Sequence, residues 1–244
     1  METATTEDRL IDGRVRLLQP ATGYRAAIDP VFLAAAIQAR PGERMLDAGA
    51  GVGAASLCLA LRLPSIHVTG LEIDPATVAL ARRNIALNGL EGRVEALAGS
   101  LADPPAPIAA AGFDQVMTNP PFTEAGTRPA DPARALAHIE GELSLADWLR
   151  ACIGLLKPKG TLTLIHRADR LDAILAALAG QAGEAAILPL WPMAGKPAKR
   201  VLVRARKAIA SPATLPPGLV LHEADGRYTA AAEAILRKGE GLSF

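Results

Sequence analysis

Glycine stands at every second position from Gly49 to Gly53 in the segment DAGAGVGA, between a short apolar run and an amphipathic one. Glycines let the backbone turn tightly and approach a ligand closely, so we expect a small molecule to bind over this turn. Nineteen residues beyond Gly53, Glu72 ends the next apolar run, where a carboxylate can accept hydrogen bonds from a ribose diol. The alternative is that the glycines only pack a helix on a strand and that Glu72 faces solvent. Asp74 is expected to cap a helix.

The ligand of the turn is indicated by the residue that precedes it. Gly49, Gly51 and Ala54 also satisfy the dinucleotide fingerprint, so a nicotinamide cofactor stays open as an alternative. Asp47 lies two positions before the first glycine. A carboxylate there can meet the amino-acid end of a cofactor, whereas it would crowd a pyrophosphate. The turn therefore favours a cofactor with an amino-acid group.

A second candidate site is the NPPF motif, which follows the fourth predicted strand and comprises Asn119, Pro120, Pro121 and Phe122. Proline fixes the backbone and removes N–H donors, so the turn can present the Pro120 carbonyl and the Asn119 side-chain oxygen as two acceptors. Two acceptors suit an amino group with a delocalised lone pair, because accepting both protons favours its pyramidal, nucleophilic form. Phe122 would stack on a planar base or amide. A proline-rich turn that only ends a strand is the alternative.

The elements that must position these residues form an α/β domain. Short apolar runs alternate with longer amphipathic ones from residue 43, which predicts a doubly wound, mostly parallel, seven-stranded Rossmann-like sheet covered by helices. The chain has 244 residues, of which 50% are hydrophobic, enough for one large core. Residues 1–42 are expected to form an arm and a cofactor-covering helix capped by Asp29, and residues 43–244 the main domain, in one compact unit.

Composition excludes several classes of protein. No uncharged apolar run approaches the ~18 residues of a membrane-spanning helix, and the polar N-terminus is unlike a signal peptide, so a cytoplasmic location without membrane contact is expected. Cys58 and Cys152 lie in apolar stretches and are expected to be buried structural thiols, not metal ligands. The net charge of +1 shows no global attraction to nucleic acid, and 3% aromatic residues are too few for a multi-base stacking platform.

A local basic segment can still bind nucleic acid. Six of the twelve residues from 196 to 207 are basic and none is acidic. They are Lys196, Lys199, Arg200, Arg204, Arg206 and Lys207. On a strand, the three arginines share one face, which predicts a phosphate-binding strip with salt-sensitive RNA binding. The alternative is a solvated edge strand protected by its charges.

The glycine turn and the NPPF motif together resemble the class I S-adenosylmethionine-dependent methyltransferases that modify amino groups, over residues 43–165. Outside this core, LLQPATGYRAAIDPVFLAAAI and the segments KRVLVRARK and LVLHEADGRYTAAAEAILR resemble the valine-tRNA (adenine-N6)-methyltransferase family. The resemblance implies S-adenosyl-L-methionine as cofactor and tRNA as the partner, with adenine N6 as the methyl acceptor. A protein glutamine amide and an amine of ribosomal RNA are the alternatives, and a silent nucleotide-binding module is one from another class.

The resemblance also assigns roles to individual residues. Asn119 and Pro120 would hold the target amine, and Phe122 would stack on it. The cofactor would be held by Asp47, Gly49, Gly51, Gly53 and Glu72. A segment containing Gln19, Tyr24, Arg25 and Asp29 would close over its methionine end. Many such families carry an aspartate after the third strand to contact the cofactor adenine. Ser100 stands there in this chain, and Asp103 is a candidate substitute.

Overall fold

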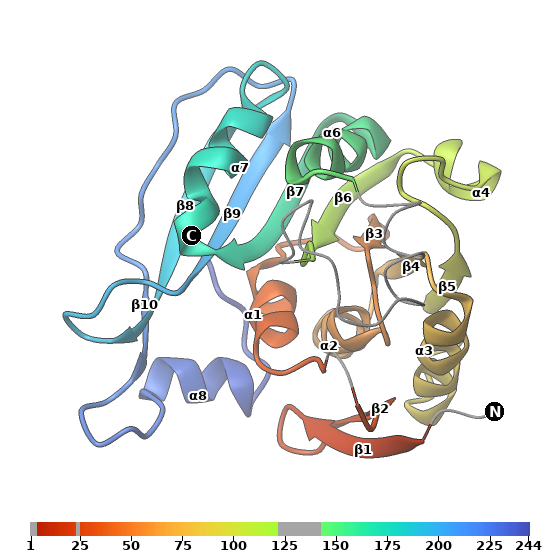
Figure 1. The fold of residues 1–244 in the computed structure, drawn as a ribbon, viewed down its shortest axis with the longest axis horizontal. Helices are drawn as coiled ribbons and strands as arrows, with labels where there is room; N and C mark the ends of the chain where they lie inside the picture. The colour runs from red at the N-terminus through yellow and green to blue at the C-terminus, as the bar shows by residue number, and fades with distance from the viewer. Residues whose placement is uncertain (1–3, 23–24, 122–142) are drawn as a thin grey trace.

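An eight-stranded sheet forms the centre of the protein in the computed structural model, which describes residues 4–22, 25–121 and 143–244 (Figure 1). The strand order is β10-β8-β9-β7-β6-β3-β4-β5, and all neighbours are parallel except β9, which is antiparallel to both β7 and β8. The strands are β3 (Arg44–Ala48), β4 (His67–Glu72), β5 (Val94–Ala98), β6 (Phe113–Thr118), β7 (Leu156–Arg167), β8 (Ala182–Met193), β9 (Arg200–Lys207) and β10 (Leu219–His222). The prediction of a mostly parallel α/β sheet is confirmed, with eight strands where about seven were expected.

Helices cover both faces of this sheet. One face carries α1 (Asp29–Ala36), α2 (Ala54–Arg62), α3 (Pro75–Leu87) and α8 (Ala230–Leu236). The other carries α4 (Ala106–Ala109), α6 (Leu145–Leu155) and α7 (Leu171–Leu178), the last preceded by the short 3-10 helix η1 (Ala168–Arg170). Successive strand residues point to opposite faces, so Leu202 of β9 enters the first core and Val203 the second. The result is a three-layer α/β/α domain.

The chain reverses its direction of progress through the sheet between β3 and β6. From β3 it proceeds to β4 and β5 on one side, and then returns to β6 and β7 on the other. Open α/β sheets bind ligands in the crevice outside the carboxyl ends of the strands at such a switch point. The glycine turn follows β3 and the NPPF motif follows β6, so the topology brings the two sequence motifs to this one crevice.

The N-terminal arm is a β-hairpin that packs on the first helical layer. Strands β1 (Thr5–Leu10) and β2 (Val15–Pro20) pair in antiparallel register, joined by a turn in which Asp12 and Gly13 have φ of 53° and 83°. The buried side chains of β2 join the core of α1 and α2. A domain division at residue 42 stays a prediction.

Of the two predicted helix caps, Asp74 is confirmed and Asp29 is wrong. Asp74 caps α3 by accepting from the N–H groups of Ala76 and Thr77, at 3.2 and 3.1 Å. Ser144 caps α6 by accepting from the Asp147 N–H. Asp29 lies inside the first turn of α1 and makes no cap hydrogen bond. Its carboxylate is instead drawn to the Arg200 guanidinium, at 2.8 Å.

Three further expectations concern the environment of the chain. Cys58 and Cys152 are both buried, as predicted, and burial raises the pKa of the Cys58 thiol to about 12. Strand β9 lies between β7 and β8, so the alternative that it is a charged edge strand is wrong. Within the described ranges, every helix is too short or too polar to cross a membrane.

Candidate active site

The glycine turn leaves one side of its backbone open. Gly49, Gly51 and Gly53 all have positive φ, at 73°, 56° and 88°. Residues other than glycine rarely adopt this backbone conformation. The N–H groups of Gly49 and Ala50 donate to the Leu71 carbonyl at 2.9 and 3.0 Å, which fastens the turn to β4. A Cβ added at Gly51 would meet no atom within 4 Å. A ligand can therefore lie directly on the backbone at Gly51.

Glu72 lies beside this open backbone. Its carboxylate accepts from the Gly51 N–H at 2.9 Å and from the Asp74 N–H at 3.1 Å, one bond on each oxygen. Each oxygen has a second lone pair that can accept a hydroxyl. The position fits a ribose diol on the turn, and these residues together fit a cofactor of the nucleoside type.

Asp47 lies beneath the turn. Only 2% of its surface is exposed, and its carboxylate accepts a hydrogen bond of 2.7 Å from the Ser56 hydroxyl. Burial raises the pKa of Asp47 to about 6, opposed by the bond from Ser56 and assisted by the negative charge of Glu72. A positive charge bound above the turn would favour the ionised carboxylate.

Asn84, which was not predicted, connects the glycine turn to the N-terminal hairpin. Its buried side-chain N–H groups donate to the carbonyls of Val52 and Leu18 at 3.0 and 2.9 Å, and its oxygen accepts from the Leu18 N–H at 2.7 Å. Asn88, one helical turn later, pairs in the same way with the N–H and carbonyl of Arg16. The sequence signal for this contact is the spacing of the two asparagines, because residues four apart lie on the same face of a helix.

Two residues of the predicted closing segment hold the chain before α1 against the hairpin. The Gln19 carboxamide accepts from the Ala26 N–H at 2.7 Å and donates to the Ala26 carbonyl and the Asp8 carboxylate. Arg25 forms an ion pair with Asp8. Tyr24 lies outside the described residues. The assigned contacts of this segment with the cofactor stay predictions.

The turn that begins at Asn119 is tied to the glycine turn through Thr118 and Trp148, neither of which was predicted from the sequence. The Thr118 hydroxyl donates to the Ala48 carbonyl at 2.7 Å and accepts from the Trp148 Nε1–H at 2.9 Å. A Cβ added at Gly49 would lie 2.9 Å from the Trp148 ring. Asn119 follows Thr118 directly. Trp148 therefore contacts the ends of both strands that flank the crevice.

The residues after Thr118 continue the crevice. Asn119 is half-buried, Pro120 is buried and Pro121 is exposed. Phe122 lies outside the described residues. Their roles toward an amine stay predictions.

The remaining cofactor candidate, Ser100, lies at the same edge of the sheet. It follows β5, and its hydroxyl accepts from the Ala102 N–H at 3.1 Å. Asp103 is exposed. Candidates thus follow the carboxyl ends of four strands adjacent in the sheet, β6, β3, β4 and β5.

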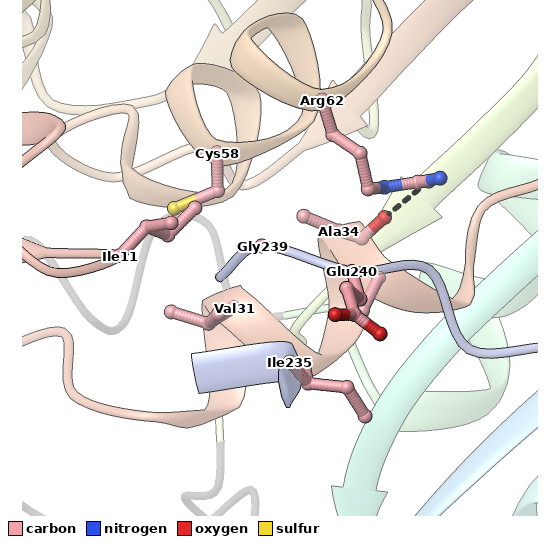
Figure 2. Close-up of a pocket in the computed structure, with 9 residues that line it drawn as sticks. Ile11, Val31, Ala34, Cys58, Arg62, Ile235, Gly239 and Glu240 are labelled. Atoms are coloured by element: carbon pink, nitrogen blue, oxygen red, sulfur yellow. Dashed lines mark hydrogen bonds between the residues drawn. The ribbon is translucent and has the colours of Figure 1, made fainter. Parts of the chain in front are cut away.

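A small pocket between α1, α2 and α8 lies apart from these turns (Figure 2). Its walls include Val31, Cys58, Ile235 and Arg62. The Arg62 guanidinium donates to the carbonyls of Ala34, at 2.8 Å, and Ile37. Both carbonyls lie at the C-terminal end of α1, where a positive charge interacts favourably with the helix dipole. The pocket is part of the packing of α1.

Comparison with known proteins agrees with this geometry. The family model described as "Methyltransferase small domain" matches residues 27–143, a range that contains both turns. Fold, site and match define a methyltransferase, and its cofactor is S-adenosylmethionine. Two curated proteins named tRNA1(Val) (adenine(37)-N6)-methyltransferase are similar over most of their length. The one from Aeromonas hydrophila is 32% identical, over 84% of this chain and 85% of its own. The one from Porphyromonas gingivalis is 31% identical, over 86% of each chain. The chain belongs to the family of these enzymes.

A solved structure supports the same fold. The crystal structure of Atu636 from Agrobacterium tumefaciens, titled a predicted O-methyltransferase, superposes with a TM-score of 0.74 at 26% identity. The match covers 88% of this chain and 99% of that one. The methyltransferase prediction is thereby confirmed, and the family favours it over the nicotinamide-dependent oxidoreductase and the silent binding module.

Proposed function

We propose that this enzyme transfers the methyl group of S-adenosylmethionine to N6 of an adenine in tRNA. The observation that carries the proposal is the adjacency of the two turns: the glycine turn ends β3, the Asn119 turn ends β6, and Thr118 and Trp148 join them. The names of the curated relatives support tRNA as the substrate. A cytoplasmic location stays a prediction.

The cofactor is assigned to the open side of the glycine turn. Glu72 accepts the ribose hydroxyls, Gly51 and its neighbouring glycines allow close approach, and Ser100 lies toward the base. Asp47 acts from beneath the turn, where its negative charge stabilises the cationic methionine end. When bound, the cofactor supplies an electrophilic methyl group on its sulfonium.

The amine is assigned to Asn119 and Pro120. Their two oxygens accept both protons of the exocyclic amine, which localises its lone pair toward the methyl group. The new bond forms from nitrogen to carbon as the bond from sulfur breaks, and the surplus proton leaves for solvent. Phe122 is assigned to stacking on the base from the sequence motif alone. No general base is needed before transfer.

The test identifies the product. The purified protein is incubated with labelled S-adenosylmethionine and unmodified bulk tRNA, and the RNA is digested to nucleosides. We expect label in N6-methyladenosine. Parallel incubations with ribosomal RNA and with protein fractions examine the alternatives. Label in methylated glutamine or only in ribosomal RNA would contradict the proposal. A thermal shift with S-adenosylhomocysteine, and none with NAD, checks that the cofactor site is intact.

A further inference from the structure

The predicted basic strip is divided by the structure into two parts with different surroundings. Strand β9 begins with Arg200 at the carboxyl end of β7, where it pairs in register with Arg167. It then runs toward the amino end of β7, where Arg206 pairs in register with Thr161. At about 3.3 Å per residue, Arg200 and Arg206 lie roughly 20 Å apart. One surface for a single ligand group cannot include both.

The far part of the strip is engaged within the protein. Arg204 donates to the backbone oxygen of Phe244, and its guanidinium lies 5.0 Å from the centre of the Phe244 ring. Arg206 pairs with Glu184 at 3.1 Å. Lys207 donates to the carbonyls of Gly154 and Leu156. These side chains hold the sheet to the C-terminus and to α6.

The near part belongs to a larger group of cations at the active-site edge, which we call the carboxyl-edge cluster. It joins residues from the end of β7, from η1 and from the turn between β8 and β9. Its members are Arg167, Arg170, Lys196, Lys199 and Arg200. The Ala168 N–H donates to the Lys199 carbonyl at 3.1 Å, which holds the two segments together. Burial and the charges of the three arginines of the cluster lower the pKa of the neighbouring His166 to about 4.

The cluster lies next to the amine-binding turn. Strand β7 neighbours β6, and its Leu164 pairs with Thr118. Arg167 is three residues further along, so it projects roughly 10 Å beyond Thr118 at the same edge. Lys196 and Lys199 are exposed, and neither forms an ion pair in the described part of the chain. Asp29 and Asp169 bind Arg200 and Arg167, and so orient these guanidinium groups.

We propose that the carboxyl-edge cluster binds the phosphates of the RNA that flanks the methylated base, and that Arg204 and Arg206 take no part. The proposal rests on the proposed function. Clustered cations on one surface bind the nucleic-acid backbone irrespective of sequence and release counterions when they do so. Lys196 and Lys199 are exposed and form no ion pair within the described residues, so they carry the clearest test.

The test compares two double variants that each remove two positive charges. Lys196→Ala with Lys199→Ala alters the cluster. Arg40→Ala with Lys159→Ala removes exposed cations at the opposite edge, before β3 and within β7. Binding of unmodified tRNA is followed by fluorescence anisotropy over a salt series with S-adenosylhomocysteine present. The slope of log affinity against log salt is negative. We expect its magnitude to be smaller by about 1.5 in the first variant, because two phosphate contacts are lost. The second variant should keep the slope of the wild type.

Kinetics separates binding from the chemical step. The cluster variant should raise KM for tRNA with kcat and S-adenosylhomocysteine affinity unchanged, because phosphate contacts are the same in the ground and transition states. If both double variants lose the same tRNA affinity, or the cluster variant loses none, the carboxyl-edge cluster is not the phosphate-binding surface. In that case, tRNA methylation by the wild type still supports the proposed function. If the wild type neither binds nor methylates tRNA, both proposals are overturned.

Discussion

The indole N–H of Trp148 donates a hydrogen bond of 2.9 Å to the hydroxyl of Thr118, the residue immediately before Asn119. The same hydroxyl donates to the carbonyl of Ala48 at the end of β3. The Trp148 ring also fills the space beside Gly49. One side chain of α6 thus contacts both the glycine turn after β3 and the residue before the Asn119 turn.

This relationship predicts energetic coupling between the two residues. Trp148→Phe keeps a ring but loses the donor, and Thr118→Val removes the hydroxyl with little change of volume. We expect each variant to reduce kcat more than the affinity for S-adenosylhomocysteine. In a double-mutant cycle of unfolding free energies, the coupling should be about 1 kcal/mol, the net value of one hydrogen bond. Additive effects would show that the bond holds nothing in place.

Two glycines of the turn should respond differently to the same change. Gly49→Ala places a methyl group 2.9 Å from the Trp148 ring and at positive φ, so we expect a loss of stability of about 2–3 kcal/mol. Gly51→Ala meets no neighbouring atom, so only the strain of its φ remains, about 1 kcal/mol. The methyl group at Gly51 should instead weaken S-adenosylhomocysteine binding at least tenfold. Denaturant unfolding and calorimetric titration measure the two effects. If Gly51→Ala binds S-adenosylhomocysteine as tightly as the wild type, the cofactor does not lie on this turn.

Asn84 and Asn88 form a matched pair that tests the link between hairpin and cofactor turn. Both clamp β2, but only Asn84 also reaches the Val52 carbonyl inside the glycine turn. Asn84→Ala leaves the buried Val52 carbonyl and the part-buried backbone groups of Leu18 without this partner, at a cost of about 3 kcal/mol. It should also weaken S-adenosylhomocysteine binding, measured at a temperature where the variant is folded. Asn88→Ala should lose less stability and keep the affinity of the wild type. The same affinity in both variants would limit Asn84 to holding the hairpin.

Asp47 should make both stability and cofactor affinity depend on pH. Its folded-state pKa of about 6 exceeds the usual 3.8, so the protonated form favours folding and the contribution is lost as pH rises through 6. Asp47→Asn stays neutral and can still accept from Ser56. We expect it to be more stable than the wild type at pH 8, by up to about 3 kcal/mol, and equal to it below pH 4. Thermal unfolding across this range measures the difference.

The same group predicts how binding responds. The α-ammonium group of S-adenosylhomocysteine, held near Asp47, favours the ionised carboxylate, so affinity should rise between pH 5 and 7 in the wild type and stay flat in Asp47→Asn. A parallel rise in both proteins would assign the pH dependence to another group.

Local signals in the sequence predicted the frame of the site but not its connections. Alternating apolar runs located the strands, and Asp74 was recognisable as a cap because the geometry of a cap is local. Thr118, Trp148 and Asn84 act through contacts between residues 30 to 70 positions apart, which no periodicity encodes. The sequence around Asp29 is typical of a cap, but its ion-pair partner, Arg200, lies 171 residues away and has no local signal. The basic strip is continuous in sequence, yet it forms an extended strand, so its first and last residues lie at opposite ends of the strands of the sheet.

We propose that Asn119 accepts the protons of the target amine, and single-turnover methyl transfer by Asn119→Ala measures this role. The rate is measured with tRNA and saturating S-adenosylmethionine, and the S-adenosylhomocysteine affinity of the same preparation is measured beside it. We predict a rate at least 100-fold below the wild type, as for the loss of one preorganised polar contact, with the affinity within about threefold. A wild-type rate, or a rate that falls only in proportion to cofactor affinity, would contradict the claim.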